Sequence, residues 1–121
     1  MEPGETLEEA IKREVLEETG IEADVEGLLG VRNMIYEHKG RPRSEFHLIF
    51  LLSWREGEPK ADGVELEEVH FFTEDEILQQ VKIGESTRRI IKKALAGQTL
   101  KPMRTEAYKL PENYQAHVAF V

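Results

Sequence analysis

The 121-residue sequence predicts one α+β domain with a mixed or antiparallel sheet. Three observations predict this class: a capped amphipathic segment near the N-terminus, two extended apolar segments after it, and two shorter capped segments further on. The sequence has no internal repeats and no low-complexity segments. A chain of this length is sufficient to build one hydrophobic core.

The first helix is predicted to run from Leu7 to Thr19. Thr6 and Glu9 have the spacing of a capping box, in which the hydroxyl caps the helix and the glutamate bonds back to the cap residue. Gly20 occupies the position where a left-handed residue commonly ends a helix.

Extended chain is predicted from Ile21 to Tyr36, with breaks at Gly27 and Gly30. The nearly continuous apolar run from Phe46 to Trp54 is typical of a central strand buried on both faces. We expect the segment between them, Glu37 to Glu45, to be a polar, partly basic loop that closes a hairpin. The aromatic residues assigned to the core are Phe46, Phe50, Trp54, Phe71 and Phe72.

The second half of the chain is predicted to contain one half-exposed strand within Val64–Phe72 and two helices. Thr73 and Glu76 form a second capping box, and Ser86 is expected to cap a third helix that Gly97 ends. We expect residues 1–97 to form the domain and residues 98–121 a C-terminal extension. Its last stretch, YQAHVAFV, is either a strand or a mobile tail.

Composition excludes several classes of function. The net charge of −8 argues against a general nucleic-acid-binding surface, and the absence of cysteine excludes disulfides, zinc–thiolate sites and thiol nucleophiles. No apolar run approaches the ~20 residues of a membrane span. The acidic N-terminus lacks a signal-peptide pattern, so a cytoplasmic protein is the default expectation.

Three glutamates, Glu14, Glu17 and Glu18, occupy the last turns of the first helix, where the partial negative charge of the helix end disfavours carboxylates. With Glu14 at 0°, Glu18 falls near 40° and Glu17 near 300°, on the face of the apolar residues in the first half of the helix. Solvated glutamates are the ordinary explanation of an acidic helix, but this shared face predicts partial burial.

Partly buried carboxylates need a positive partner, because two of them ~5 Å apart repel by roughly 3 kcal/mol at an effective dielectric constant of about 20. Arg13 lies four residues before Glu17 and can pair with it, which leaves Glu14 and Glu18. A hard divalent cation such as Mg²⁺ would neutralise that pair, since it prefers a few carboxylates together with water and substrate phosphates.

The same stretch resembles the Nudix box, G-x5-E-x7-R-E-U-x-E-E-x-G-U, where U is a bulky aliphatic residue. Glu5 takes the position of the early glutamate, and Arg13–Ile21 match every position from R-E onward. The resemblance implies a Nudix-like α/β/α sandwich with a mixed sheet. The first glycine of the box would fall two residues before Met1, and the strands that precede the box in Nudix domains are absent, so we expect a fragment or an internal start.

For function, the resemblance implies hydrolysis of a diphosphate linkage in a nucleoside diphosphate derivative or a nucleoside triphosphate, with Mg²⁺ or Mn²⁺ as cofactor. It implies Glu14 and Glu18 as metal ligands and Glu17 as a ligand or a water-bridged group at the metal. It also implies that Arg13 orients a glutamate, through Glu5.

The general base is left open between a glutamate of the box and a carboxylate on a later loop. The later candidates are Glu65, Glu67 and Glu68, of which Glu65 matches best by its distance from the following aromatic pair. Solvated acids are the alternative for Glu67 and Glu68. Three basic residues outside the box are predicted to bind the phosphates of the substrate: Arg32, Arg41 and Arg43. The alternative is that they are ordinary solvated arginines.

Three functions therefore compete. The first is a metal-dependent pyrophosphohydrolase acting on a small nucleotide-type substrate, without a nucleic acid polymer or a membrane as partner and with a homodimer left open. The second is a non-catalytic Nudix-like nucleotide-binding module or an inactive truncated fragment. The third is an interaction protein that uses its acidic helix and has no small-molecule site.

Overall fold

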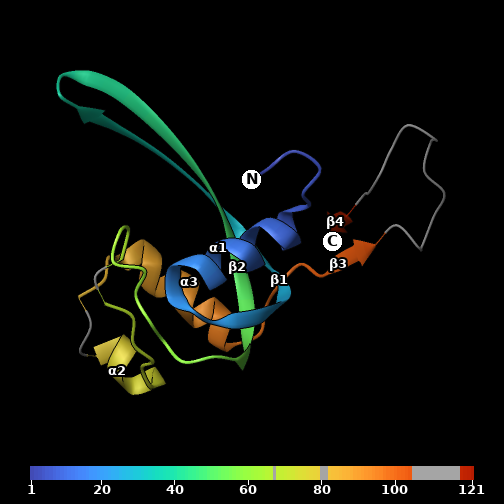
Figure 1. Cartoon of the computed structure of the whole chain (residues 1–121). Helices are drawn as coiled ribbons and strands as arrows, with labels where there is room; N and C mark the ends of the chain where they lie inside the picture. The colour runs from blue at the N-terminus through green and yellow to red at the C-terminus, as the bar shows by residue number, and fades with distance from the viewer. Residues whose placement is uncertain (67, 80–81, 105–117) are drawn as a thin grey trace, which may run out of the picture.

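The computed structural model describes residues 1–66, 68–79, 82–104 and 118–121 (Figure 1). One helix is followed by two strands, and then two helices are followed by two strands. The strands of both sheets pair in antiparallel fashion, which confirms the α+β class. No helix of this described part is long and apolar enough to cross a membrane. The elements in chain order are α1 (Leu7–Thr19), β1 (Glu22–His38), β2 (Arg41–Glu56), α2 (Glu74–Gln79), α3 (Glu85–Leu95), β3 (Pro102–Arg104) and β4 (Val118–Phe120).

Helix α1 has the predicted bounds. The backbone N–H of Glu9 donates to the Thr6 hydroxyl at 3.2 Å, and Gly20 ends the helix in the left-handed conformation with φ 74°. The N–H of Lys60, from the chain that follows β2, donates to the Thr19 carbonyl at 2.8 Å. One of the carbonyls left free at the end of the helix is thereby satisfied by a distant segment.

Strands β1 and β2 form one long hairpin, so the prediction of a loop from Glu37 to Glu45 is wrong. The turn consists of Lys39 and Gly40, with φ 52° and 73°. Two successive left-handed residues match the right-handed twist of paired strands, and the ladder therefore continues almost to the turn. The register shifts next to Gly27 and Gly30 agree with the predicted breaks in β1.

The two helices that flank the hairpin lie on opposite faces of it. Val15 of α1 lines a groove together with Phe50 and Leu52, whereas Ile90 of α3 lines a cleft together with Ile49. Consecutive residues of a strand point to opposite faces, so the hairpin is sandwiched between α1 and α3. This arrangement agrees with the expected α/β/α layering at that end of the hairpin.

The other end of the hairpin projects from the body of the molecule as an arm (Figure 1). The expectation that Phe46–Trp54 is buried on both faces is therefore wrong, since no residue of β2 is buried and Phe46, Leu48 and Trp54 are exposed. Four aromatic residues assigned to the core are exposed, and Phe50 is half-buried, packed edge-to-face on Phe120 at 5.4 Å. The buried apolar side chains of the described residues are Ala10, Ile21, Ala23 and Leu29, and each keeps 4 to 8% of its surface exposed.

The second half of the chain departs from prediction in two places. The described residues between Val64 and Phe72 form no strand, and α3 is capped by Gly84 rather than Ser86. The capping box of α2 is present in full, because the N–H of Glu76 donates to the Thr73 hydroxyl and the N–H of Thr73 donates to the Glu76 carboxylate.

The last described residues form a strand, β4, which pairs with β3. For residues 118–120 this agrees with the strand alternative, whereas residues 114–117 of the predicted segment lie outside the described part.

Candidate active site

The first feature of the site is an ion pair between Arg13 on α1 and Glu5, which precedes the helix. The Arg13 Nε donates to Glu5 Oε2 at 2.8 Å, and Nη2 donates to Oε1 at 3.1 Å. These hydrogen bonds lower the pKa of Glu5 to about 2. Two parallel charge-assisted bonds hold the guanidinium in one plane, so the pair fixes both the chain before the helix and the direction of the arginine.

The same guanidinium reaches two glutamates of the helix. Nη1 of Arg13 donates to Glu17 Oε2 at 3.2 Å, which is the expected i,i+4 pair, and Nη2 lies 3.8 Å from Glu14 Oε1. The terminal amine of Met1 lies 3.9 Å from the same Glu14 oxygen. Arg13 and the terminal amine therefore place their positive charges beside Glu14 and Glu17, whereas none of these ion pairs includes Glu18.

Glu18 instead lies against Glu65, which comes from the loop after β2. A hydrogen bond between the two carboxyl groups raises the pKa of Glu18, and burial together with the charges of Glu65, Glu14 and Asp62 acts in the same direction. The structure therefore brings the predicted general base beside a predicted metal ligand, although the two are far apart in the sequence. It also keeps Glu14 close enough to Glu18 for their charges to interact.

Asp62 shapes the loop that carries Glu65. Its Oδ1 accepts the backbone N–H groups of Val64, Glu65 and Leu66 at 2.9, 3.0 and 3.0 Å, and these bonds lower the pKa of Asp62. The prediction from sequence missed this residue. The dipeptide Asp62-Gly63 is a turn signal of the kind in which an aspartate accepts hydrogen bonds from its own loop, and it was the available clue.

The donor set at this place fits a hard divalent cation. Within the described residues no three His, Asp or Glu side chains already stand at metal-binding spacing. Glu18 and Glu65, however, bring two carboxyl groups within hydrogen-bonding reach of each other, and carboxylate oxygen is the ligand that Mg²⁺ prefers. A cation bound between them would offset their negative charge together with that of Glu14 and Asp62.

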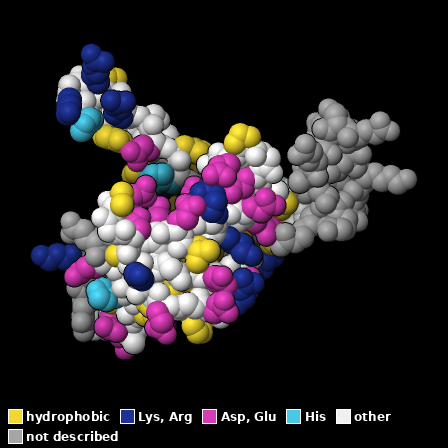
Figure 2. All heavy atoms as spheres, in the orientation of Figure 1, with side chains coloured by type: hydrophobic (Ala, Val, Ile, Leu, Met, Phe, Trp, Pro, Cys, Tyr) yellow, Lys and Arg dark blue, Asp and Glu magenta, His cyan; other side chains and the backbone are white. Residues whose placement is uncertain are grey.

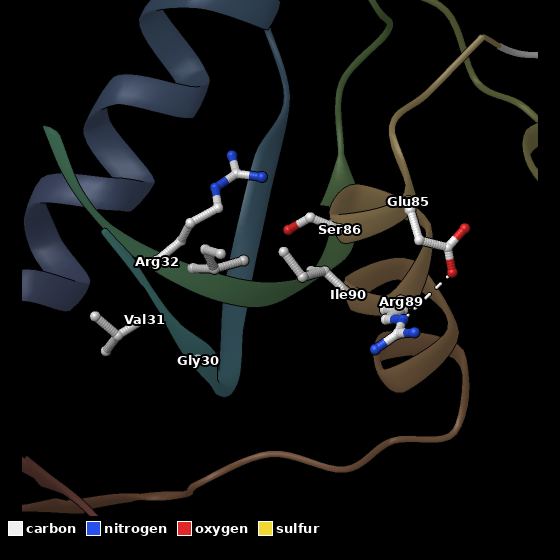
Figure 3. Close-up of a pocket in the computed structure, with 8 residues that line it drawn as sticks. Gly30, Val31, Arg32, Glu85, Ser86, Arg89 and Ile90 are labelled. Atoms are coloured by element: carbon white, nitrogen blue, oxygen red, sulfur yellow. Dashed lines mark hydrogen bonds and ion pairs between the residues drawn. The ribbon is translucent and has the colours of Figure 1, made fainter. Parts of the chain in front are cut away.

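Arg32, a predicted substrate-binding residue, lies in a cleft of about 470 Å³ between β1 and α3 (Figure 3). Its Nη1 donates to the Thr87 hydroxyl and its Nη2 to His47 Nδ1, both at 3.4 Å, while its buried Nε has no partner among the described residues. Arg89 adds a second cation, paired with Glu85 at 3.3 Å. The cleft thus presents positive charge beside the apolar side chain of Ile90.

The remaining candidates are not brought to the carboxylates of the same chain. Arg41 and Arg43 are exposed at the far end of the arm. Glu68 is exposed and lies 3.8 Å from His70, and Glu67 falls outside the described residues. Of the three later candidates for the general base, Glu65 is the one that the described part of the chain brings to the box.

A family model of the NUDIX domain matches residues 1–94. The chain belongs to the Nudix family. The expected resemblance is confirmed, and the described geometry now places the Nudix box: Glu5 and Arg13 form its ion pair, and Glu14, Glu17 and Glu18 lie on its helix.

Three curated relatives of this Nudix chain have hydrolase names. The NAD-capped RNA hydrolase NudC of Vibrio vulnificus (strain CMCP6) is 35% identical over 107 residues, covering 88% of this chain and 37% of the relative. An NAD-capped RNA hydrolase of Schizosaccharomyces pombe is 35% identical over 83 residues, covering 68% and 21%. An ADP-ribose pyrophosphatase of Methanocaldococcus jannaschii is 43% identical over 74 residues, covering 60% and 41%. This Nudix chain thus spans less than half the length of each relative.

Proposed function

We propose that this protein is a divalent-metal-dependent Nudix pyrophosphohydrolase that cleaves a diphosphate linkage in a nucleotide. The observation that carries the proposal is the contact between Glu18 of the Nudix helix and Glu65 of the later loop. That contact combines a ligand for a cation with a group able to accept a proton, which are the two functions that hydrolysis of a phosphoric anhydride requires.

Glu14 and Glu18 would hold the cation, Mg²⁺ or Mn²⁺, and Glu17 would lie at its edge. When bound, the cation would offset the charge of the diphosphate, polarise a phosphoryl oxygen and lower the pKa of bound water. Arg13 is a positioning residue, because it holds Glu17 at 3.2 Å while Glu5 fixes its plane at 2.8 Å. This clamp sets the direction of the glutamates before any substrate binds.

Glu65 is the general base of the proposed reaction. Its carboxylate would accept a proton from the attacking water, the water oxygen would form a bond to phosphorus, and the bridging P–O bond would break as the leaving phosphate departs with the electron pair. The loop bonds to Asp62 keep Glu65 at this position. The outcome is two phosphate monoesters, with water consumed.

The substrate class that we propose is an adenosine diphosphate ester. The names of the relatives specify ADP-ribose and NAD-capped RNA, and both compounds contain adenosine attached to a diphosphate. The cleft around Arg32 would take the part of the substrate beyond the reacting phosphates, since it offers cations and an apolar wall. We therefore expect turnover of ADP-ribose and NAD, and NAD-capped RNA enters the test as a third substrate.

The test is an assay of AMP release from ADP-ribose, NAD and a short NAD-capped RNA, with Mg²⁺ and with EDTA. Release that requires Mg²⁺ and falls at least about 100-fold in Glu65→Gln and Glu18→Gln supports the proposal. Glu56→Gln is the matched control, because Glu56 also lies against another glutamate, Glu22, but at the base of the hairpin. Equal activity of Glu65→Gln and wild type would remove Glu65 from the mechanism, and a folded wild type without turnover would overturn the enzymatic proposal.

A further inference from the structure

The arm, defined here as residues 31–48, is a two-stranded ribbon that projects from the body of the molecule (Figure 1). Its strands keep a regular register up to the turn, because the shifts in register lie closer to the body. Cross-strand partners share a face of the ribbon, and so does every second residue of a strand. One face of the arm therefore carries four cross-strand pairs: Arg32 with His47, Met34 with Glu45, Tyr36 with Arg43, and His38 with Arg41.

This face, called the basic face, ends in a group of cations. Arg41 and Arg43 lie on it, and Lys39 lies in the turn beyond them. The three side chains form no ion pair within the described residues, in a protein whose net charge is −8. Figure 2 shows positive side chains gathered at the end of the arm and acidic side chains gathered on the body. Local positive charge of this kind attracts a polyanion even though the protein as a whole is acidic.

The carboxylate on the basic face is engaged by its neighbours. Glu45 is the single acid among the described residues of this face. It accepts a hydrogen bond from the Tyr36 hydroxyl at 2.6 Å, and its other oxygen lies 3.2 Å from His47. Glu45 therefore leaves the arginines at the end of the arm free to bind an anion.

Tyr36 adds an aromatic ring among the cations. Its side chain is 43% exposed, and the bond from its hydroxyl to Glu45 holds the ring in place. Tyr36 lies directly across from Arg43, and the next pair of the same face toward the turn contains Arg41. The bases of a single strand stack on exposed aromatic rings, while cations beside the rings bind the sugar–phosphate backbone. The basic face thus combines the two features by which proteins bind single-stranded nucleic acid.

The basic face begins at the cleft between β1 and α3. Arg32, its first residue, lines the cleft and donates to the Thr87 hydroxyl of α3 at 3.4 Å (Figure 3). From Arg32 to His38 the strand extends about 20 Å, at a rise of ~3.3 Å per residue. This length corresponds to roughly six nucleotides of a stacked strand at ~3.4 Å each. The cleft and the basic face therefore form one continuous path from the body to the end of the arm.

We propose that the basic face of the arm binds single-stranded RNA, with backbone phosphates at Lys39, Arg41 and Arg43 and a base stacked on Tyr36. The adenosine of an NAD cap is the first nucleotide of its RNA, so a cap bound in the cleft directs the following nucleotides onto the arm. This direction of the strand rests on the proposed function, whereas the binding of RNA to the arm does not. The contacts are to phosphates and to the face of a base, and the binding is therefore independent of base sequence.

Fluorescence anisotropy with a short, uncapped, 3′-labelled single-stranded RNA tests the binding. We expect a Kd below about 100 µM at low salt for the wild type, and binding at least about tenfold weaker for Arg41→Ala/Arg43→Ala. The slope of log K against log [salt] should be about −2 for the wild type, because each of the three phosphate contacts contributes roughly 0.7, and about −0.7 for the double variant. The control Arg55→Ala/Lys92→Ala removes two exposed cations outside the arm and should bind like the wild type.

The aromatic contact has its own pair of variants. Tyr36→Ala should weaken RNA binding about tenfold, whereas Tyr36→Phe keeps the ring and should retain most of the affinity. A wild type that does not bind at about 100 µM overturns the proposal, and so do arm and control variants of equal affinity. Duplex RNA that binds as tightly as the single strand also overturns it, because paired bases cannot stack on Tyr36. Tighter binding to phosphatidylserine vesicles than to RNA would assign the arm to a membrane surface instead.

Steady-state kinetics test the direction of the strand. The kcat/KM for NAD-capped RNA is divided by the kcat/KM for NAD, so that any effect on the shared cap site cancels. We expect this ratio to fall at least about tenfold in Arg41→Ala/Arg43→Ala and to keep its wild-type value in Arg55→Ala/Lys92→Ala. An unchanged ratio in an arm variant that has lost RNA binding would refute the path from the cleft to the arm. If the wild type cleaves neither substrate, the proposed function fails, and the anisotropy measurement still decides whether the arm binds RNA.

Discussion

Arg13 binds Glu5 through two hydrogen bonds, of 2.8 and 3.1 Å, and binds Glu17 through a third, of 3.2 Å. A lysine has a single ammonium group and cannot form this planar arrangement. We expect Arg13→Lys to reduce kcat by up to about 100-fold, because the glutamates at the metal lose their fixed direction. Steady-state kinetics with ADP-ribose measures the effect. A change confined to KM would show that Arg13 contributes to substrate binding rather than to positioning.

The Arg13–Glu5 pair also predicts a pH dependence of stability. The pKa of Glu5 is about 2 in the folded protein, against an ordinary value of 4.5, so its stabilising effect is complete above pH 4.5 and is lost as the pH falls toward about 2. We expect the difference in Tm between wild type and Glu5→Gln to be constant from pH 7 to 5 and to shrink below pH 4.5. A difference that stays constant down to pH 2.5 would contradict this origin.

Metal binding should be visible as stabilisation. A cation that binds only the folded state adds about 2.7 kcal/mol to the free energy of unfolding at 100 times its Kd. We expect Mg²⁺ to raise the Tm of the wild type and of Glu56→Gln, and EDTA to reverse the change. Glu18→Gln should lose most of the shift, because it removes one of the two proposed principal ligands. An equal shift in all three proteins would place the cation elsewhere.

Alanine variants of Gly57 and Gly40 can be compared to test how closely the end of α1 packs against the end of the hairpin. Both have positive φ, 103° and 73°, but an added Cβ at Gly57 would collide with the carbonyl oxygen of Gly20, whereas at Gly40 it would meet nothing. We expect Gly40→Ala to lower the free energy of unfolding by about 1 kcal/mol and Gly57→Ala to lower it by about 2–4 kcal/mol. Urea titration measures both. Equal losses would show that conformation alone, without the collision, determines the cost.

Local interactions made the helices and the Nudix box predictable from sequence. The bounds of α1, its Thr6 cap and its Gly20 end depend on residues within one turn of each other, and so does the capping box of Thr73 and Glu76. The carboxylates of the box follow directly, because the period of the helix determines their spacing.

Tertiary structure alone decided which distant groups meet. The contact between Glu65 and Glu18 depends on the path of the chain after β2 and on the backbone bonds to Asp62, and these have no signature in the spacing of the two glutamates. Apolar content predicted Phe46–Trp54 to be buried on both faces, but burial depends on what covers a strand, and β1–β2 continues as an exposed arm. Arg41 and Arg43 are consequently far along that arm. Sequence determines which residues favour helix, strand or turn, whereas packing over long distances determines which of them become neighbours.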